Sequence, residues 1–271
     1  MRQRAIIFVY RMEKYMIYIV GGNGFVGSAI VRQCISRKLE YTIVTRENAQ
    51  QLYGTHCELL INANGNSKKY MAEREPLWEF DASVRSVHEY LVNIHADKYV
   101  QLSSCDVYPN CADYDGTSEQ QVIDIAQQSA YGFHKYMAEL CVRHYAANWL
   151  IFRMGGFVGP GLKKNAIYDI LHNDPLWLAA DSQLQFISTD AAAKIILDLA
   201  FSGHCNEIYN LCGDGTVCLQ DIMNHVGYTG EKRSESKTVK YEVNVNKLKQ
   251  LVPLQKSSEA VFGYVDREMR G

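Results

Sequence analysis

The sequence predicts an α/β fold in which helices cover both faces of a doubly wound, parallel sheet. Short apolar segments rich in β-branched residues alternate with segments that have the apolar spacing of helices. A glycine-rich turn follows the first of these apolar segments, and several later ones end in polar or small residues. Strands that alternate with helices in this way form parallel sheets.

The alternation is regular over residues 16–161 and weaker over 162–271. We therefore expect a large core over 16–161. Most of residues 162–271 should form a smaller lobe, and the rest of that segment should contribute further elements to the core. The two parts should make one compact body, because no repeat, low-complexity run or long linker separates them. Residues 1–15 are expected to be an N-terminal extension or a misassigned start, since Met12 and Met16 stand just before the first strand.

Composition excludes several classes of protein. The chain has 271 residues, of which 47% are hydrophobic and 21% charged, as in globular domains. A net charge of −2 argues against a nucleic-acid binder. The eight cysteines form no C-x-x-C pair, so we expect reduced thiols, a cytoplasmic location and no metal site. The apolar run at residues 5–10 is too short to span a membrane.

The first strand, over residues 17–20, runs into a turn with glycines at Gly21, Gly24 and Gly27. A helix is predicted directly after it, over Phe25–Ser36. Glycines permit tight turns and close approach of the backbone to a ligand, and a helix N-terminus attracts phosphate. The pattern therefore predicts the pyrophosphate loop of a dinucleotide-binding unit. An ordinary tight turn between strand and helix is the alternative.

The second strand, over Tyr41–Thr45, is followed by Arg46 and Glu47. The residue at this place meets the adenine ribose, where a carboxylate binds the 2′-hydroxyl and an arginine binds a 2′-phosphate. Arg46 therefore favours NADP(H), and Glu47 keeps NAD(H) possible. The alternative is a solvated surface arginine.

Later strands are predicted over 58–65, 98–104 and 149–154. Their carboxyl ends should face the ligand crevice, which brings Asn62 and Ala63 near the cofactor. Helices are predicted between them, one over residues 80–94 and one that begins at Ser129. A glycine-rich turn is expected over 155–161, and the last helix over 245–252.

The helix that begins at Ser129 carries Tyr131 and Lys135, which lie one turn apart on one face. A tyrosine ionises near pH 10, so an adjacent ammonium and an oxidised nicotinamide should lower its pKa and make it an acid/base. Ser104, at the end of a strand, should supply a hydroxyl to the substrate. The alternative is an exposed helical pair without a role.

The glycine loop, Ser103-Ser104 and the Tyr131-x-x-x-Lys135 spacing, in this order, resemble the extended short-chain dehydrogenase/reductases, the NAD-dependent epimerase/dehydratase family. Four further segments add to the resemblance: Leu102–Tyr108, Arg153–Gly161, Phe186–Ala192 and Glu207–Gly213. The resemblance covers roughly residues 16–268. It implies a Rossmann-like core, a small C-terminal substrate-binding lobe, and an NAD(P)-dependent enzyme of nucleotide-sugar metabolism.

The resemblance also implies roles for single residues. Tyr131 would be the acid/base, Lys135 its partner and a ligand of the nicotinamide ribose, and Ser104 the hydroxyl that orients the substrate. Asp106 stands where family dehydratases carry a glutamate base, so it is a weaker catalytic candidate. The predicted cofactor-binding residues are Gly21, Gly24, Phe25, Val26, Gly27, Arg46, Asn62, Ala63, Tyr131 and Lys135.

The expected function is therefore an epimerase, dehydratase or ketoreductase that uses Tyr131 for hydride transfer at a carbinol or keto carbon. The expected substrate is a small molecule, most simply a nucleotide sugar, with no nucleic acid or membrane partner. The alternative is a catalytically silent NAD(P)-binding regulatory or scaffold protein of the same fold. A homodimer through the helix that bears Tyr131 is a further expectation.

Overall fold

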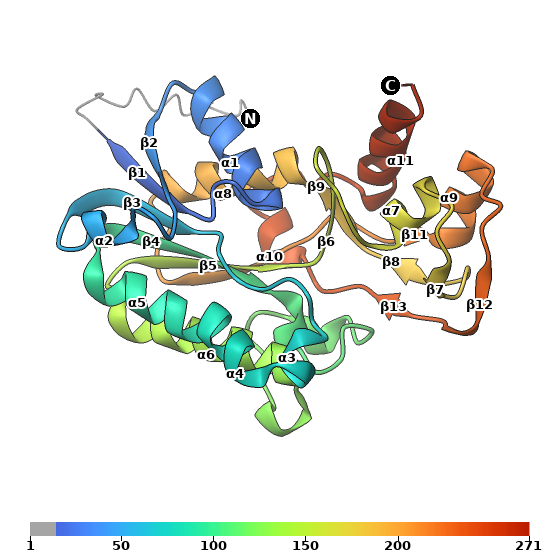
Figure 1. Ribbon diagram of the computed structural model, residues 1–271, viewed down its shortest axis with the longest axis horizontal. Coiled ribbons are helices and arrows are strands. Elements are labelled where there is room, and N and C mark those ends of the chain that lie inside the picture. The colour runs from blue at the N-terminus through green and yellow to red at the C-terminus, as the bar shows by residue number, and fades with distance from the viewer. Residues whose placement is uncertain (1–14, 271) are drawn as a thin grey trace, which may run out of the picture.

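The computed structural model describes residues 15–270, apart from the side chains of 232–234. Within that range, six parallel strands form the main sheet in the order β10-β5-β4-β3-β1-β2 (Figure 1). Their bounds are β1 Met16–Val20, β2 Glu40–Val44, β3 His56–Asn62, β4 His95–Ser104, β5 Trp149–Met154 and β10 Glu207–Leu211. The chain runs from β1 to β2 and then crosses to β3 on the other side of β1. The sheet is therefore doubly wound, and its topological switch point lies between β1 and β3.

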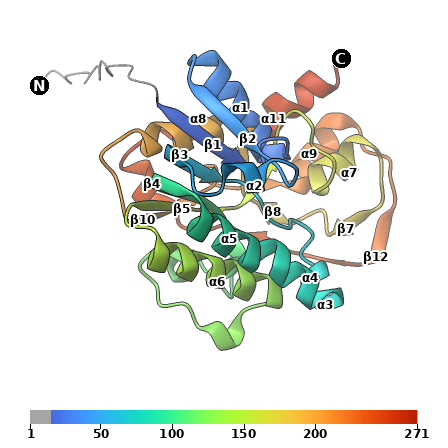
Figure 2. The same ribbon diagram turned by 60° about the vertical axis from the view of Figure 1, so that its left-hand side comes forward.

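Helices cover both faces of this sheet, as the sequence predicts. On one face α1 (Phe25–Ser36) packs against α8 (Thr189–Ala200), and on the other α5 (Ser86–Asn93) packs against α6 (Ala130–Tyr145) (Figures 1 and 2). The central strands are apolar along both faces because both are covered. Ile17, Ile19 and Leu60 have no exposed surface. The shorter helices near the sheet are α2 Ala49–Leu52, α3 Met71–Arg74, α4 Pro76–Phe80 and α10 Asn246–Lys249.

Most of the remaining chain forms a smaller lobe beside the carboxyl ends of the strands (Figure 1). Its helices are α7 Ala166–Leu171, α9 Leu219–Val226 and α11 Ser257–Glu268. Its short strands are β6 Gly156–Val158, β7 Leu176–Leu178, β8 Gln183–Leu184, β9 Phe186–Ser188, β11 Val217–Cys218, β12 Lys232–Lys237 and β13 Lys240–Tyr241. An apolar core of its own holds this lobe together, with Ile167, Ile222 and Val261 fully buried.

Three elements differ from the sequence prediction. The helix expected over 80–94 is divided, because a π-helical turn at Asp81–Arg85 separates α4 from α5. The extra residue of such a turn shifts the helix faces, so Phe80 is 38% exposed instead of buried. The turn expected over 155–161 contains β6. The last helix is α11, not the segment over 245–252, where only the four-residue α10 forms.

Candidate active site

The glycine-rich turn joins β1 to α1 through backbone contacts that only glycine permits. Gly21 has a left-handed conformation with φ of +74°, and its carbonyl accepts the N–H of Gly24 at 2.9 Å. A Cβ on Gly27 would come closer than 3.0 Å to the same carbonyl. The first turn of α1 therefore starts directly against the end of β1.

The N-terminus of α1 is suited to an anion. Its N-cap, Gly24, offers no side-chain hydrogen bond, and no acidic residue occupies the first turn. The N–H groups of Phe25, Val26 and Gly27 lie before the first intrahelical hydrogen bond, which the N–H of Ser28 makes. These free donors and the positive end of the helix dipole fit the pyrophosphate of a dinucleotide.

Arg46 and Glu47 lie in the turn after β2, and both side chains are exposed. Asn48 fixes the turn, since its Oδ1 accepts the Thr45 N–H at 2.7 Å and its Nδ2 donates to the Ile43 carbonyl at 2.9 Å. The pKa of Glu47 is lowered, chiefly by a hydrogen bond from the Thr45 side chain. A positively charged side chain, Arg46, and a negatively charged one, Glu47, therefore follow each other at the end of β2.

The end of β3 lies beside the glycine turn, but the side chain of Asn62 already has partners within the protein. Its Nδ2 donates to the Tyr99 hydroxyl at 2.8 Å, and its Oδ1 accepts the Asn64 N–H at 3.0 Å. Ala63 packs against the turn so closely that a Cβ on Gly21 would lie 3.0 Å from the Ala63 carbonyl. A cofactor contact for Asn62 or Ala63 stays a prediction.

Ser104 is the last residue of β4 and caps the short 3₁₀ turn of Cys105–Val107. Its hydroxyl accepts the N–H of Asp106 at 3.1 Å and donates to Asp106 Oδ2 at 2.8 Å. The other carboxylate oxygen accepts from Lys69 Nζ at 2.6 Å, from the loop that follows β3. Both oxygens of Asp106 are therefore engaged, one of them by the residue predicted to orient the substrate.

Tyr131 and Lys135 lie on the inner face of α6, and both are buried. The Ser129 hydroxyl caps this helix by accepting a backbone N–H of the first turn at 3.1 Å. The Tyr131 hydroxyl donates to the Asn66 carbonyl at 3.0 Å. Lys135 Nζ lies 5.5 Å from the centroid of the Tyr131 ring. A Cβ on Gly65 would lie 2.5 Å from the same Nζ atom. The loop after β3 thus covers the predicted catalytic pair.

The pKa of Tyr131 is raised in the structure, whereas the sequence predicts that Lys135 and an oxidised nicotinamide together lower it. Burial raises the pKa of Tyr131, the charges of Asp106 and Glu79 raise it further, and the Ser104 hydroxyl acts against them. Burial also lowers the pKa of Lys135 to about 8, against the opposing effects of Glu79 and Asp106. Tyr131 is therefore protonated at neutral pH and able to donate a proton.

A cleft of about 510 Å³ opens beside Tyr131. Core segments around Asp106 and Ser129 form part of its wall, and residues 239–241 of the smaller lobe form another part. Aromatic side chains with hydroxyl groups are frequent in the lining: Tyr70, Tyr108, Tyr131 and Tyr241. Lys69 lies in the lining too, 5.6 Å from the ring centroid of Tyr241.

Sequence reasoning missed Asn66 and Lys69, which contact two of the predicted catalytic residues. Both belong to the polar loop after β3, and loops at the carboxyl ends of parallel strands face the ligand crevice. That rule would have identified the loop as part of the site. It would not have identified the partners, because the contacts span 37 to 65 residues of sequence.

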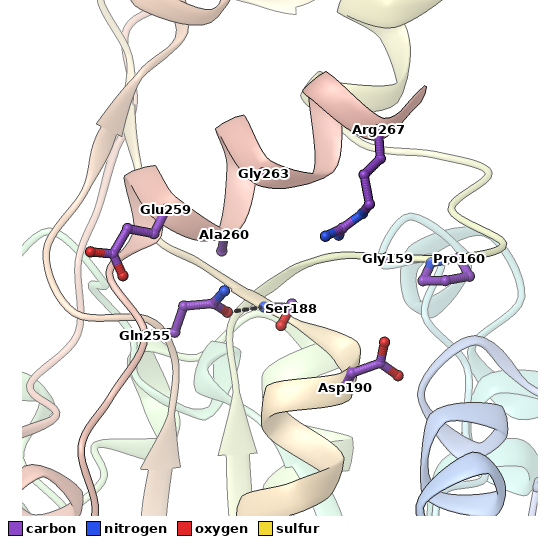
Figure 3. Close-up of a pocket in the computed structure, with 9 residues that line it drawn as sticks. All are labelled: Gly159, Pro160, Ser188, Asp190, Gln255, Glu259, Ala260, Gly263 and Arg267. Carbon is purple, nitrogen blue, oxygen red and sulfur yellow. Dashed lines mark hydrogen bonds between the residues drawn. The ribbon is translucent and has the colours of Figure 1, made fainter. Parts of the chain in front are cut away.

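A second, smaller cavity of about 210 Å³ lies beneath α11 and shares no lining residue with the cleft at Tyr131 (Figure 3). Arg267 points into it from α11, above Ser188 and Asp190 at the start of α8 (Figure 3). The Gln255 side chain accepts the Ser188 N–H at 3.1 Å, and Asp190 pairs with Arg32 of α1. The first contact joins the segment before α11 to the end of β9, and the second joins α8 to α1.

Among residues 15–270, no helix is long and apolar enough to cross a membrane. The same residues contain no group of three or more His, Cys, Asp and Glu side chains that could hold a metal ion.

The model of the NAD dependent epimerase/dehydratase family matches residues 17–212. A search of curated proteins finds no match. Among solved structures, a UDP-galactose 4-epimerase is 20% identical with a TM-score of 0.76, over 94% of this chain and 99% of that one. MoeE5 in complex with UDP-glucose and NAD is 12% identical with a TM-score of 0.77, over 94% and 98%. A dTDP-4-dehydrorhamnose reductase from Clostridium acetobutylicum is 17% identical with a TM-score of 0.71, over 94% and 99%. At these identities the structural likeness concerns the fold.

Proposed function

The chain belongs to the NAD dependent epimerase/dehydratase family, and from this premise we propose that it transfers hydride between NAD(P) and a carbon of a nucleotide sugar. The observation that carries the proposal is that Ser104 and Lys135 both lie close to Tyr131, which lines an open cleft. The glycine turn that fits a pyrophosphate lies at the same edge of the sheet. Cofactor and substrate sites would therefore adjoin at Tyr131.

In this proposal Tyr131, Ser104 and Lys135 each have a separate role in the reaction. The bound nicotinamide supplies the hydride or accepts it. Tyr131 gives a proton to the substrate oxygen when a ketone is reduced, and takes it back when the alcohol is oxidised. Ser104 orients that oxygen, and Lys135 holds the ribose and stabilises the phenolate that proton donation leaves. For either step the Tyr131 hydroxyl must exchange its hydrogen bond to Asn66 for one to the substrate.

The raised pKa of Tyr131 keeps its hydroxyl protonated at neutral pH, which is the form that donates a proton to a ketone. Epimerases and dehydratases of this family begin by oxidising an alcohol, which is the reverse of ketone reduction, so the same residues would serve an epimerase, a dehydratase or a ketoreductase. The proposal is tested by incubating the protein with NADPH or NADH and 4-keto nucleotide sugars. We expect the cofactor to be consumed, and native mass spectrometry to show cofactor and nucleotide sugar bound together. Absence of both results would contradict the proposal.

The substrate proposal draws on the cleft and on the known structures of similar fold. MoeE5 binds UDP-glucose, and two other similar structures are named for enzymes of UDP- or dTDP-sugars. The tyrosine rings and hydroxyls in the cleft supply apolar faces and hydrogen bonds, which is the mixture a sugar requires. Within this proposal residues 16–161 bind the cofactor, and most of 162–271 binds the substrate.

We propose that Asp106 orients Ser104 and does not remove a carbon-bound proton, because both its oxygens are already engaged. Asp106→Asn should lower kcat of ketone reduction about tenfold, since one charge-assisted hydrogen bond is worth about 1.5–3 kcal/mol. Cofactor affinity should stay unchanged. Steady-state kinetics measures both. The product that the wild type forms should have the mass of the reduced substrate, with no loss of water. A dehydrated product that disappears in the variant would instead make Asp106 an elimination base.

We propose that Arg46 selects NADP(H). Arg46→Ala should weaken NADP binding about tenfold or more, because a charge-assisted contact to the 2′-phosphate is lost. NAD binding should change less than about threefold. Fluorescence titration of both cofactors measures this, with Arg85→Ala as the control, since Arg85 is an exposed arginine engaged by Asp81. Equal or tighter binding of NAD by the wild type would contradict the proposal.

We also propose a homodimer through α6 and α4. Apolar side chains are exposed on both helices, and Leu77 is 83% and Leu140 44% exposed. On α6, Leu140 and His144 are exposed, whereas Met137 and Cys141 are half-buried. Leu140→Glu should convert a dimer to a monomer in light scattering without a change in thermal stability. A wild-type monomer at high concentration would exclude the dimer.

A further inference from the structure

The loop between β3 and α3, residues 63–70, lies over the predicted catalytic pair, and we call it the covering loop. The Tyr131 hydroxyl donates its one proton to the Asn66 carbonyl at 3.0 Å, in a buried contact. The backbone of Gly65 lies against Lys135, since a Cβ on this glycine would be 2.5 Å from Lys135 Nζ. In this position the covering loop takes the hydrogen bond of Tyr131 and leaves Lys135 only 6% exposed.

The covering loop is organised by its own hydrogen bonds. The Asn66 side chain binds the backbone of Lys68 twice, because Oδ1 accepts its N–H at 2.7 Å and Nδ2 donates to its carbonyl at 2.8 Å. Asn66 is 8% exposed and faces α6, whereas Ser67 and Lys68 are exposed. The bonds within the covering loop do not depend on its contact with Tyr131. The segment can therefore keep its shape when it moves away from the catalytic pair.

Two lysines attach the covering loop to different parts of the molecule. Lys69, within the covering loop, pairs with Asp106 of the core at 2.6 Å. Lys164 approaches from the smaller lobe, where it lies between β6 and α7. Its Nζ donates to the Ser67 carbonyl at 2.6 Å and to the Ser67 hydroxyl at 2.9 Å, across 97 residues of sequence. The smaller lobe thus holds the covering loop down over the core.

The backbone next to Lys164 is fixed in an unusual conformation. Asn165 has φ of +130°, which is costly for a residue with a side chain. Its side chain compensates: Oδ1 accepts the N–H groups of Ile167 and Tyr168 at 3.0 and 3.1 Å, and Nδ2 donates to the Phe157 carbonyl at 2.9 Å. Strained residues of this kind are frequent at ligand clamps and switch regions. Lys164 therefore extends from a fixed anchor.

We propose that the covering loop is a lid over Tyr131 and Lys135, and that Lys164 holds it closed in the protein without ligands. The inference rests on the proposed function for its consequence, since the lid would control access of cofactor and substrate to these two residues. A protein whose binding-competent state is only partly populated binds its ligand more weakly by that fraction. Loss of the Lys164 contact should therefore raise the open fraction and speed cofactor binding.

The test measures how accessible Lys135 is in the protein without ligands, by acetylation with acetic anhydride and peptide mass spectrometry. In Lys164→Met, which keeps a long side chain and removes the charge, Lys135 should be acetylated about tenfold faster, because charge-assisted hydrogen bonds to Ser67 are lost. Lys163→Met is the matched control, since Lys163 is the exposed lysine directly before Lys164. It should leave the rate unchanged. Lys98, whose Nζ is bound by three carbonyls, serves as the internal reference.

A second variant tests the same contact from the lid. Ser67→Ala removes the hydroxyl acceptor and keeps the carbonyl, so the acetylation of Lys135 should rise about threefold, less than in Lys164→Met. An unchanged rate in Lys164→Met, or an equal rise in Lys163→Met, would overturn the proposal. Failure of the proposed function is distinguished separately, because the wild type would then bind no cofactor whatever the acetylation shows.

Discussion

Tyr131→Phe is expected to lower kcat about a thousandfold while leaving the affinity for NAD(P) within about twofold of the wild type. The change removes one oxygen, and with it the proton that the substrate oxygen needs. The aromatic ring stays, so the 5.5 Å contact with the Lys135 ammonium is kept. The expected result is measured by single-turnover reduction of a 4-keto nucleotide sugar, with cofactor binding followed by fluorescence.

A matched control is available on the same helix. Tyr136→Phe removes a hydroxyl from a half-buried tyrosine of α6 that the mechanism does not use. It should keep the wild-type rate and thermal stability. If Tyr131→Phe turns over as fast as Tyr136→Phe, the mechanism is wrong. If the wild type binds the cofactor and turns over none of the sugars, the protein is instead a silent, cofactor-binding member of the family.

The pH dependence of the reductive reaction follows from the same two residues. Tyr131 has a raised pKa and stays protonated through the neutral range, so it does not limit proton donation there. Lys135, with a pKa of about 8, loses its charge as the pH rises through that value. Ketone reduction should therefore be level below pH 7 and fall above about pH 8.

The parts of the fold that the sequence predicted correctly depend on local patterns. The strand at residues 17–20, the glycine turn and the helix Phe25–Ser36 each follow from residues close in sequence. Tyr131 and Lys135 share a face because they stand one helical turn apart. Parallel pairing then brings the carboxyl ends of β1, β3 and β4 to one edge, where the site residues meet.

The parts that the sequence did not predict depend on contacts between distant segments. Burial, followed by the charges of Asp106 and Glu79, raises the pKa of Tyr131, and neither carboxylate is near Tyr131 in sequence. The loop after β3 reaches Tyr131 and Asp106 through Asn66 and Lys69, and its polar composition reveals no partner. Helix α11 was missed because its apolar face packs onto the smaller lobe, whose short strands follow no regular period.

Gly27→Ala should weaken cofactor binding about a hundredfold, about 2.7 kcal/mol, and lower Tm by roughly 5 °C. Gly27 lies within α1, where alanine would normally stabilise a helix by about 1 kcal/mol. Here the added Cβ would overlap the Gly21 carbonyl, and that carbonyl also accepts the Gly24 N–H that closes the turn. The start of α1 must therefore move away from β1, which would displace the N–H groups of Phe25 and Val26 from the proposed pyrophosphate site.

Gly263→Ala is the matched control, because Gly263 lies within α11 and a Cβ there meets nothing within 4 Å. It should raise Tm slightly and leave cofactor binding unchanged, so that helix propensity and steric overlap are separated. Differential scanning calorimetry and cofactor titration measure both variants. Wild-type cofactor affinity in Gly27→Ala would mean that the turn is an ordinary connection between strand and helix. The free N–H groups of α1 would then have another role, and the dinucleotide site would have to lie elsewhere along the strand ends.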